Sequence, residues 1–186
     1  MKSDIFNIKQ NRWWAVIPLI ILIWHAIYIS YTQSPDYLFF VCYPANLILI
    51  IGILFRISLF IGVGFGWTLI GFPLWLYDSH LTGNYELSCT LFHLAGILVG
   101  FMTVKQYIFP RFTWLAAILL ALFMQITARI FTDEKLNINA AFRVYEGWEG
   151  AFSNYTIYMI AMMFGFALFF LVFTTVSNWV FHRESK

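Results

Sequence analysis

Six long apolar segments constrain the fold of this chain more than any other feature of its sequence. Each is close to the roughly 20 residues that an α-helix needs to cross the hydrocarbon core of a membrane. The segments cover residues 13–30, 38–55, 57–76, 88–107, 112–131 and 156–181. Only 11% of the residues are charged, against about a quarter in soluble domains, so a water-soluble fold is excluded. We predict an all-α, polytopic integral membrane bundle of about six transmembrane helices, forming a single domain over residues 1–186.

The basic residues predict the orientation of this bundle. If the N-terminus is cytoplasmic, eight of the 11 Lys and Arg residues are cytoplasmic, as the positive-inside rule requires. The outer basic residues are then Arg129, Lys135 and Arg143. Six crossings return the C-terminus to the same side, so we predict an N-in, C-in topology with residues 1–12 and 182–186 cytoplasmic. The short loops and the charge bias favour a bacterial inner membrane.

The longest outer segment, residues 132–155, has a helical pattern. Five of its residues recur at i, i+3, i+4, i+7 and i+10 and so share one helical face: Ile138, Ala141, Phe142, Tyr145 and Trp148. Asn137 is placed to cap such a helix. We predict a short amphipathic helix lying in the outer interface, with a packed surface loop as the alternative.

Polar side chains from several helices gather at one depth of the predicted bundle. At about 1.5 Å per residue, His25, Cys42, His93 and Gln125 lie within one or two turns of one level. An ionisable side chain at membrane depth is costly and indicates a functional site by default, although single polar residues also join helices by hydrogen bonds. We therefore predict a cavity that opens to the outside. The residues predicted to form it are His25, Cys42, Asn46, Asp78, His80, Cys89, His93, Gln125, Arg129 and Trp148.

A thiol near an imidazole is the arrangement of nucleophile and base that acyl transfer uses, which predicts a lipid acyltransferase or a lipid hydrolase. Cys42 is the preferred nucleophile, because it faces His93 from another helix, and Cys89 is the alternative on the same helix as His93. Arg129 is predicted to hold a phosphate or carboxylate head group. The expected substrates are membrane lipids of the outer leaflet. A disulfide between Cys42 and Cys89 is the competing interpretation, and it would remove the free nucleophile.

Two short stretches resemble the YwaF-like family, which includes a plasmalogen acyltransferase of multi-pass type. They are residues 40–46 (FVCYPAN) and 92–96 (FHLAG), within a resemblance that covers residues 38–140. The resemblance implies that Cys42 is the acyl-accepting thiol and His93 its base. The chain departs from the family at residues 38–40 (LFF), where the family has histidines, and it is one helix shorter.

Other classes of function remain open. We predict no cofactor and no metal, but a haem- or metal-binding protein that uses His25 and His93 is an alternative, since these histidines lie at matched depths. A non-catalytic membrane subunit and a small-molecule transporter or binder are further alternatives. No basic patch with interleaved aromatic residues indicates nucleic acid. Beyond lipids, the expected partners are another membrane protein or a second copy of the chain.

Overall fold

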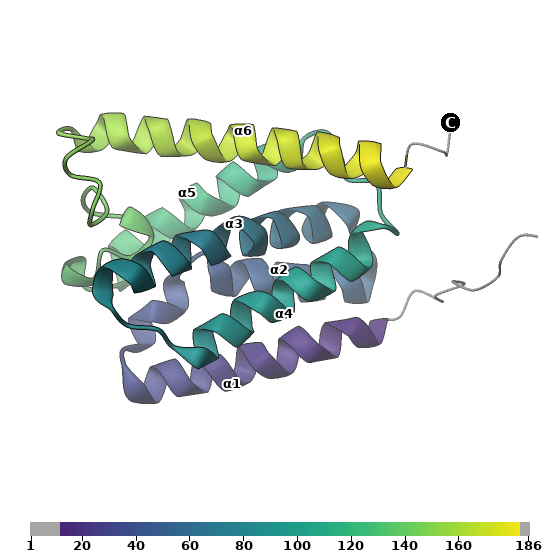
Figure 1. Ribbon diagram of the computed structural model, residues 1–186, viewed down its shortest axis with the longest axis horizontal. Helices are drawn as coiled ribbons and strands as arrows, with labels where there is room; N and C mark the ends of the chain where they lie inside the picture. Colours follow the sequence, from purple (N-terminus) through teal and green to yellow (C-terminus); the bar gives the residue numbers. More distant parts are fainter. Residues whose placement is uncertain (1–11, 183–186) are drawn as a thin grey trace, which may run out of the picture.

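In a computed structural model that describes residues 12–182, the chain forms a bundle of six α-helices (Figure 1). The helices are α1 (Val16–Thr32), α2 (Cys42–Phe55), α3 (Ser58–Thr82), α4 (Leu87–Val104), α5 (Thr113–Phe131) and α6 (Tyr155–His182). Residues 12–182 contain no β-strand. Five helices are long and apolar enough to cross a membrane, and α2 is a shorter apolar helix. The predicted all-α polytopic bundle is confirmed, and these helices are those of an integral membrane protein.

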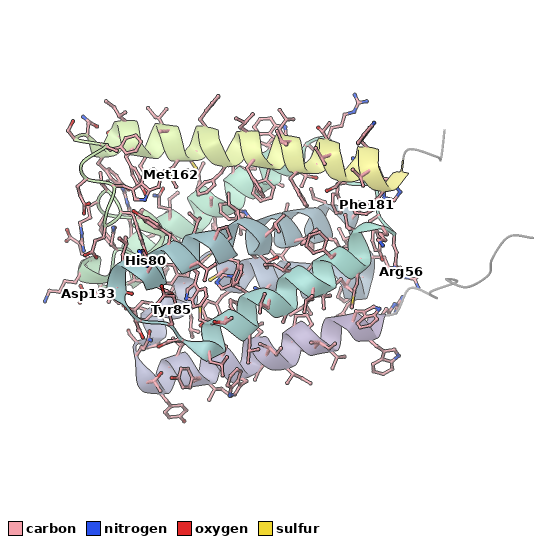
Figure 2. The ribbon with its side chains drawn as sticks, viewed as in Figure 1. Arg56, His80, Tyr85, Asp133, Met162 and Phe181 are labelled. Carbon is pink, nitrogen blue, oxygen red and sulfur yellow. The ribbon has the colours of Figure 1, made fainter. Side chains whose placement is uncertain are left out.

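The helices run alternately in opposite directions, so the loops gather at two ends of the bundle. Arg56 and Phe181 lie at one end, whereas His80, Tyr85 and Asp133 lie at the other (Figure 2). The start of α1 and the end of α6 share the end at which Arg56 lies (Figures 1 and 2). Almost all of the two segments predicted to be cytoplasmic lies outside the described residues, so the orientation stays a prediction.

Glycine lets α2 and α3 approach until their backbones touch. A Cβ atom at Gly64 would lie 2.6 Å from the Ala45 carbonyl oxygen and 2.6 Å from the Leu49 nitrogen. A Cβ atom at Gly52 would lie 2.7 Å from the Ile61 nitrogen. Because no side chain larger than hydrogen fits at either crossing point, α2 and α3 form the tightly packed centre of the bundle.

The second helix begins later than the sequence predicts. Residues 38–41 were expected to be helical, but Pro35–Phe39 form a 3₁₀ turn and Phe40 is extended, with φ −60° and ψ 139°. The side chain of Asn139 occupies this break: its Nδ2 donates to the Phe39 carbonyl at 2.7 Å, and its Oδ1 accepts from the Val41 N–H at 2.9 Å. A distant amide therefore replaces the helical hydrogen bonds at this point.

The predicted amphipathic helix in the outer loop is wrong. Residues 132–154 contain only the 3₁₀ turns Glu134–Leu136 and Ile138–Ala140. Asn137, Asn139 and Ala140 have φ values of 47°, 55° and 52°, which a right-handed helix cannot accommodate. Asn137 caps no helix, since its Oδ1 accepts from the N–H groups of Phe142 and Arg143 within a turn. The segment is the packed surface loop that was the alternative.

Candidate functional site

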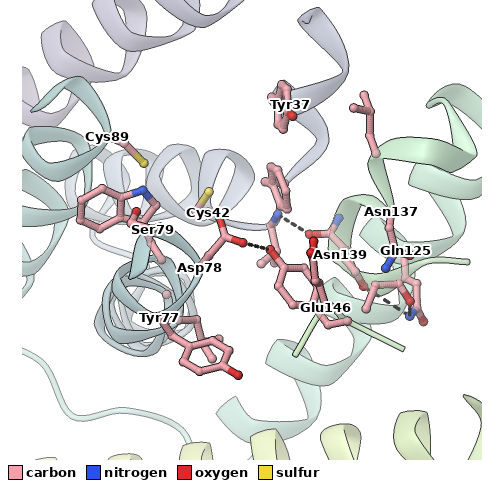
Figure 3. A pocket seen from close by; sticks show the side chains of 18 of the residues that line it. Tyr37, Cys42, Tyr77, Asp78, Ser79, Cys89, Gln125, Asn137, Asn139 and Glu146 are labelled. Carbon is pink, nitrogen blue, oxygen red and sulfur yellow. Dashed lines mark hydrogen bonds between the residues drawn. The ribbon is translucent and has the colours of Figure 1, made fainter. Parts of the chain in front are cut away.

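A cavity of about 790 Å³ lies toward the end of the bundle that bears the 132–154 loop, and Figure 3 shows part of its lining from close by. All six helices contribute to its wall, together with residues of the 132–154 loop. Seven of the ten predicted site residues line it: His25, Cys42, Asp78, Cys89, His93, Gln125 and Trp148. The structure thus brings most of the predicted polar layer around one space. Asn46, His80 and Arg129 lie outside this lining.

Two imidazoles occupy the buried part of the cavity wall. His25 on α1 and His93 on α4 are each only 2% exposed. Both rings contact Phe92, with centroid distances of 4.8 Å from His25 and 5.4 Å from His93. Tyr43 stacks on His25 at 5.4 Å with parallel rings. These aromatic contacts hold each imidazole in place without using its nitrogen atoms.

Three polar atoms in this buried part have no partner within residues 12–182. They are Nδ1 of His25, Nδ1 of His93 and the hydroxyl oxygen of Tyr43. A buried polar group without a hydrogen bond costs about 1–3 kcal/mol, so native proteins rarely leave such groups unmatched. All three residues line the cavity, so the polar groups that lack a partner belong to its wall.

Both cysteines are free, so the competing disulfide is not formed. Cys42, the first residue of α2, and Cys89, in the first turn of α4, both line the cavity. Figure 3 shows the two sulfur atoms on neighbouring helices beside Ser79 and Asp78. Within the described part of the chain, no hydrogen bond joins either sulfur to an imidazole. The thiols and imidazoles therefore share a cavity but not the direct contact of a preformed dyad.

Arg129 forms hydrogen bonds to the 132–154 loop and to α6 and does not line the cavity. Its Nε–H donates to the Ala141 carbonyl, and its Nη2 donates to the Tyr155 hydroxyl at 2.8 Å. The guanidinium carbon also lies 5.5 Å from the centre of the Tyr155 ring. The loop folds back against the end of α5 and uses these donors, so the prediction that Arg129 lines the cavity is wrong.

Gln125 lines the cavity, but its amide is similarly engaged. Its Nε2 donates to the Ala140 carbonyl at 3.2 Å and to the Met159 sulfur at 3.1 Å. The amide therefore joins α5 to the loop and to α6. It is not free to donate to a reacting oxygen in this arrangement.

Asn46 and His80 also lie away from the cavity, for different reasons. Asn46 is buried at a helix crossing, where its Nδ2 donates to the Cys42 carbonyl at 3.0 Å and its Oδ1 packs against Gly96. His80 is exposed near the end of α3, with its Nδ1 3.5 Å from the Tyr85 hydroxyl. Both were predicted to line the cavity, and neither does.

Asp78 is bonded to a residue that the sequence analysis did not select. It lies within α3, which extends to Thr82, and its Oδ1 accepts from the Tyr145 hydroxyl at 2.7 Å. Burial, and then the bond to this carboxylate, raise the pKa of Tyr145 well above its usual range. The periodicity of the loop predicts only that Tyr145 shares a helical face with its neighbours, and no local signal points to its partner 67 residues away.

Metal binding has little support among the residues that the structure describes. No group of three or more His, Cys, Asp or Glu side chains there is arranged to hold a metal ion. His25 and His93 are the only imidazoles in the cavity lining.

The comparisons with known proteins identify no relatives. No family model matches the chain, and no curated protein or solved structure shows significant similarity to it. The resemblance to the YwaF-like family therefore stays a prediction.

Proposed function

We propose that this membrane protein binds an amphiphilic lipid in the cavity. The observation that supports this proposal best is the pair of buried imidazoles, His25 and His93, which line one space and whose Nδ1 atoms have no partner within residues 12–182. A ligand carbonyl or hydroxyl there would provide the missing hydrogen bonds. The volume of about 790 Å³ is within the range of about 300–1,000 Å³ that small-molecule sites occupy.

The wall formed by α6 suits the apolar chain of such a ligand. Met159, Met162, Met163 and Phe166 on α6 line the cavity. Methionine side chains are flexible and polarisable, so they adapt to irregular apolar ligands. Polar groups on α1 and α4 therefore face an apolar wall on α6, which matches a molecule with a polar part and a hydrocarbon part.

The test compares His25→Phe and His93→Phe with the matched control His80→Phe. Phenylalanine keeps an aromatic ring but removes the nitrogen atoms, and His80 lies outside the cavity lining. Lipid retained after purification is counted by native mass spectrometry, and thermal unfolding verifies that each variant is folded. We expect retention to be weaker by about fivefold or more for the cavity variants, since each loses a hydrogen bond of about 1 kcal/mol or more. Equal retention by all three folded variants would contradict the proposal.

Acyl transfer through Cys42 is a second candidate function. The observation that favours it is that Cys42 is free and lines the same cavity as His93. The imidazole would accept the thiol proton while sulfur attacks an ester carbonyl of the bound lipid. Collapse of the tetrahedral adduct leaves a thioester on Cys42 and expels an alkoxide, which takes the proton from the imidazolium. An acceptor hydroxyl then reverses these steps and receives the acyl group.

A lipid ester with a tagged acyl chain separates this reaction from binding alone. We expect a hydroxylamine-sensitive adduct on the native protein and on Cys89→Ala, and its loss in Cys42→Ala. A native protein that retains the lipid but forms no adduct would exclude acyl transfer and leave binding intact. An adduct that persists in Cys42→Ala would exclude Cys42 as the nucleophile.

A further inference from the structure

The outer part of the cavity has an excess of negative charge. Four carboxylate side chains line it, on α3, on the turn before α4 and on the 132–154 loop: Asp78, Glu86, Glu146 and Glu149. Among the residues that the structure describes, two basic ones, Lys135 and Arg143, line the same cavity. The Arg143 guanidinium is also directed at the loop backbone, since Nη1 donates to the Glu134 carbonyl and Nη2 to the Lys135 carbonyl, each at 2.9 Å.

These carboxylates are not neutralised by neighbouring cations. Asp78 accepts from the Tyr145 hydroxyl, and Glu86 accepts from the Gln33 amide, so both partners are uncharged. Among residues 12–182, no Lys or Arg side chain forms an ion pair with any of the four. Their field therefore acts on whatever enters the cavity, and it repels an anionic head group.

Aromatic rings line the cavity beside the carboxylates. Trp75 and Tyr77 on α3 and Trp148 on the loop are part of the wall. Tyr77 and Trp148 meet edge to face at 6.3 Å, and Trp148 remains 36% exposed. Aromatic faces attract ammonium groups through the ring quadrupole, and adjacent carboxylates add direct attraction. Farther in, the unpartnered Nδ1 atoms of His25 and His93 independently indicate a missing polar ligand.

We infer that the cavity selects an amphiphile with an ammonium head group. The inference rests on the proposed lipid binding and specifies its ligand. The ammonium group lies among the carboxylates and aromatic rings of the outer part. Its hydrogen-bonding linker reaches His25 and His93, and its hydrocarbon chain follows the apolar side of α6.

The test uses two lipids with the same oleoyl chains and ester linkages. Dioleoyl-trimethylammonium-propane has a cationic head, and dioleoylglycerol has a neutral hydroxyl. Both are offered at equal mole fraction to the protein in maltoside micelles, and native mass spectrometry counts each bound lipid. We expect the native protein to prefer the ammonium lipid by about tenfold, because the carboxylates attract its cationic head group and not the neutral hydroxyl.

The double variant Glu86→Gln/Glu146→Gln is expected to lose most of this preference. The matched control is Glu134→Gln, because Glu134 is an exposed carboxylate on the same loop that does not line the cavity. Thermal unfolding shows whether the double variant is folded.

Equal binding of both lipids to the native protein would overturn the inference but leave lipid binding standing. Binding of neither lipid would overturn lipid binding itself. If Glu134→Gln lost the preference for the ammonium lipid as much as the double variant does, the preference would come from general surface charge, and the inference would be overturned.

Discussion

At the scale of single residues, depth along a helix was predictable but hydrogen-bond partners were not. His25 and His93 were selected because an imidazole is unusual in an apolar helix, and both line the cavity. Arg129 has an equally unusual position, yet its donors go to the Ala141 carbonyl and the Tyr155 hydroxyl. Those partners depend on how the outer loop folds back, and no pattern within either segment encodes that contact.

The bond between Tyr145 and Asp78 makes a pH-dependent prediction. Tyr145→Phe removes a hydrogen bond to a charged group, worth about 1.5–3 kcal/mol of unfolding free energy near neutral pH. The folded state raises the Tyr145 pKa, so its contribution is fully present below the unfolded pKa of about 10 and declines as pH rises further. Thermal unfolding from pH 7 to 11 should show the native protein more stable than the variant, with the difference narrowing above about pH 10. A constant difference across this range would contradict the assigned cause.

At the scale of elements, the lengths of the apolar segments predicted the helices because lipid leaves few alternatives to a helix. The predictions that proved wrong lie at the end of the bundle that bears the 132–154 loop. The start of α2 and the 132–154 loop depend on each other through Asn139, which bonds to Phe39 and Val41. Local periodicity cannot show a pairing across about 100 residues, so a helical pattern there was misleading.

The contact of α2 with α3 is tested by adding one methyl group. Gly64→Ala would place a Cβ atom 2.6 Å from backbone atoms of α2, which cannot move aside as a side chain can. Such overpacking typically costs about 1–3 kcal/mol. Gly165→Ala is the matched control, because nothing lies within 4 Å of its Cβ position on α6. We expect a lower unfolding temperature for the first variant and an unchanged or higher one for the second. Similar effects in both would argue against close backbone contact.

At the scale of the whole molecule, the alternating helices place the cavity at one end of the bundle and most basic loops at the other. Arg56 and Asp133 mark these opposite ends (Figure 2). The positions of the basic residues along the chain predicted which loops gather at the same end. The acidic lining of the cavity was not predictable in this way, because it depends on how the loops fold. The direction of the bundle in the membrane still follows from the positive-inside rule alone.

Single-cysteine labelling checks that direction in intact cells. In a Cys42→Ser/Cys89→Ser background, a membrane-impermeant maleimide should label Glu134→Cys on the outer loop and leave Arg111→Cys unlabelled. Both positions are exposed, so lysed cells should show labelling at both. The reverse pattern in intact cells would overturn the N-in, C-in topology, and it would place the mouth of the cavity in the cytoplasm.

The break before α2 also determines when this part of the structure can form during synthesis. α2 has only 14 residues and spans about 21 Å, less than the roughly 30 Å of the hydrocarbon core. The Phe39 carbonyl and the Val41 N–H beside it obtain their partner from Asn139, which leaves the ribosome about 100 residues later. Until then, the entry to the second crossing lacks the bonds that shape it. The site around Cys42 is therefore completed only after the fifth helix has been made. In a nascent chain that ends before Asn139, the segment next to Cys42 would lack these two hydrogen bonds.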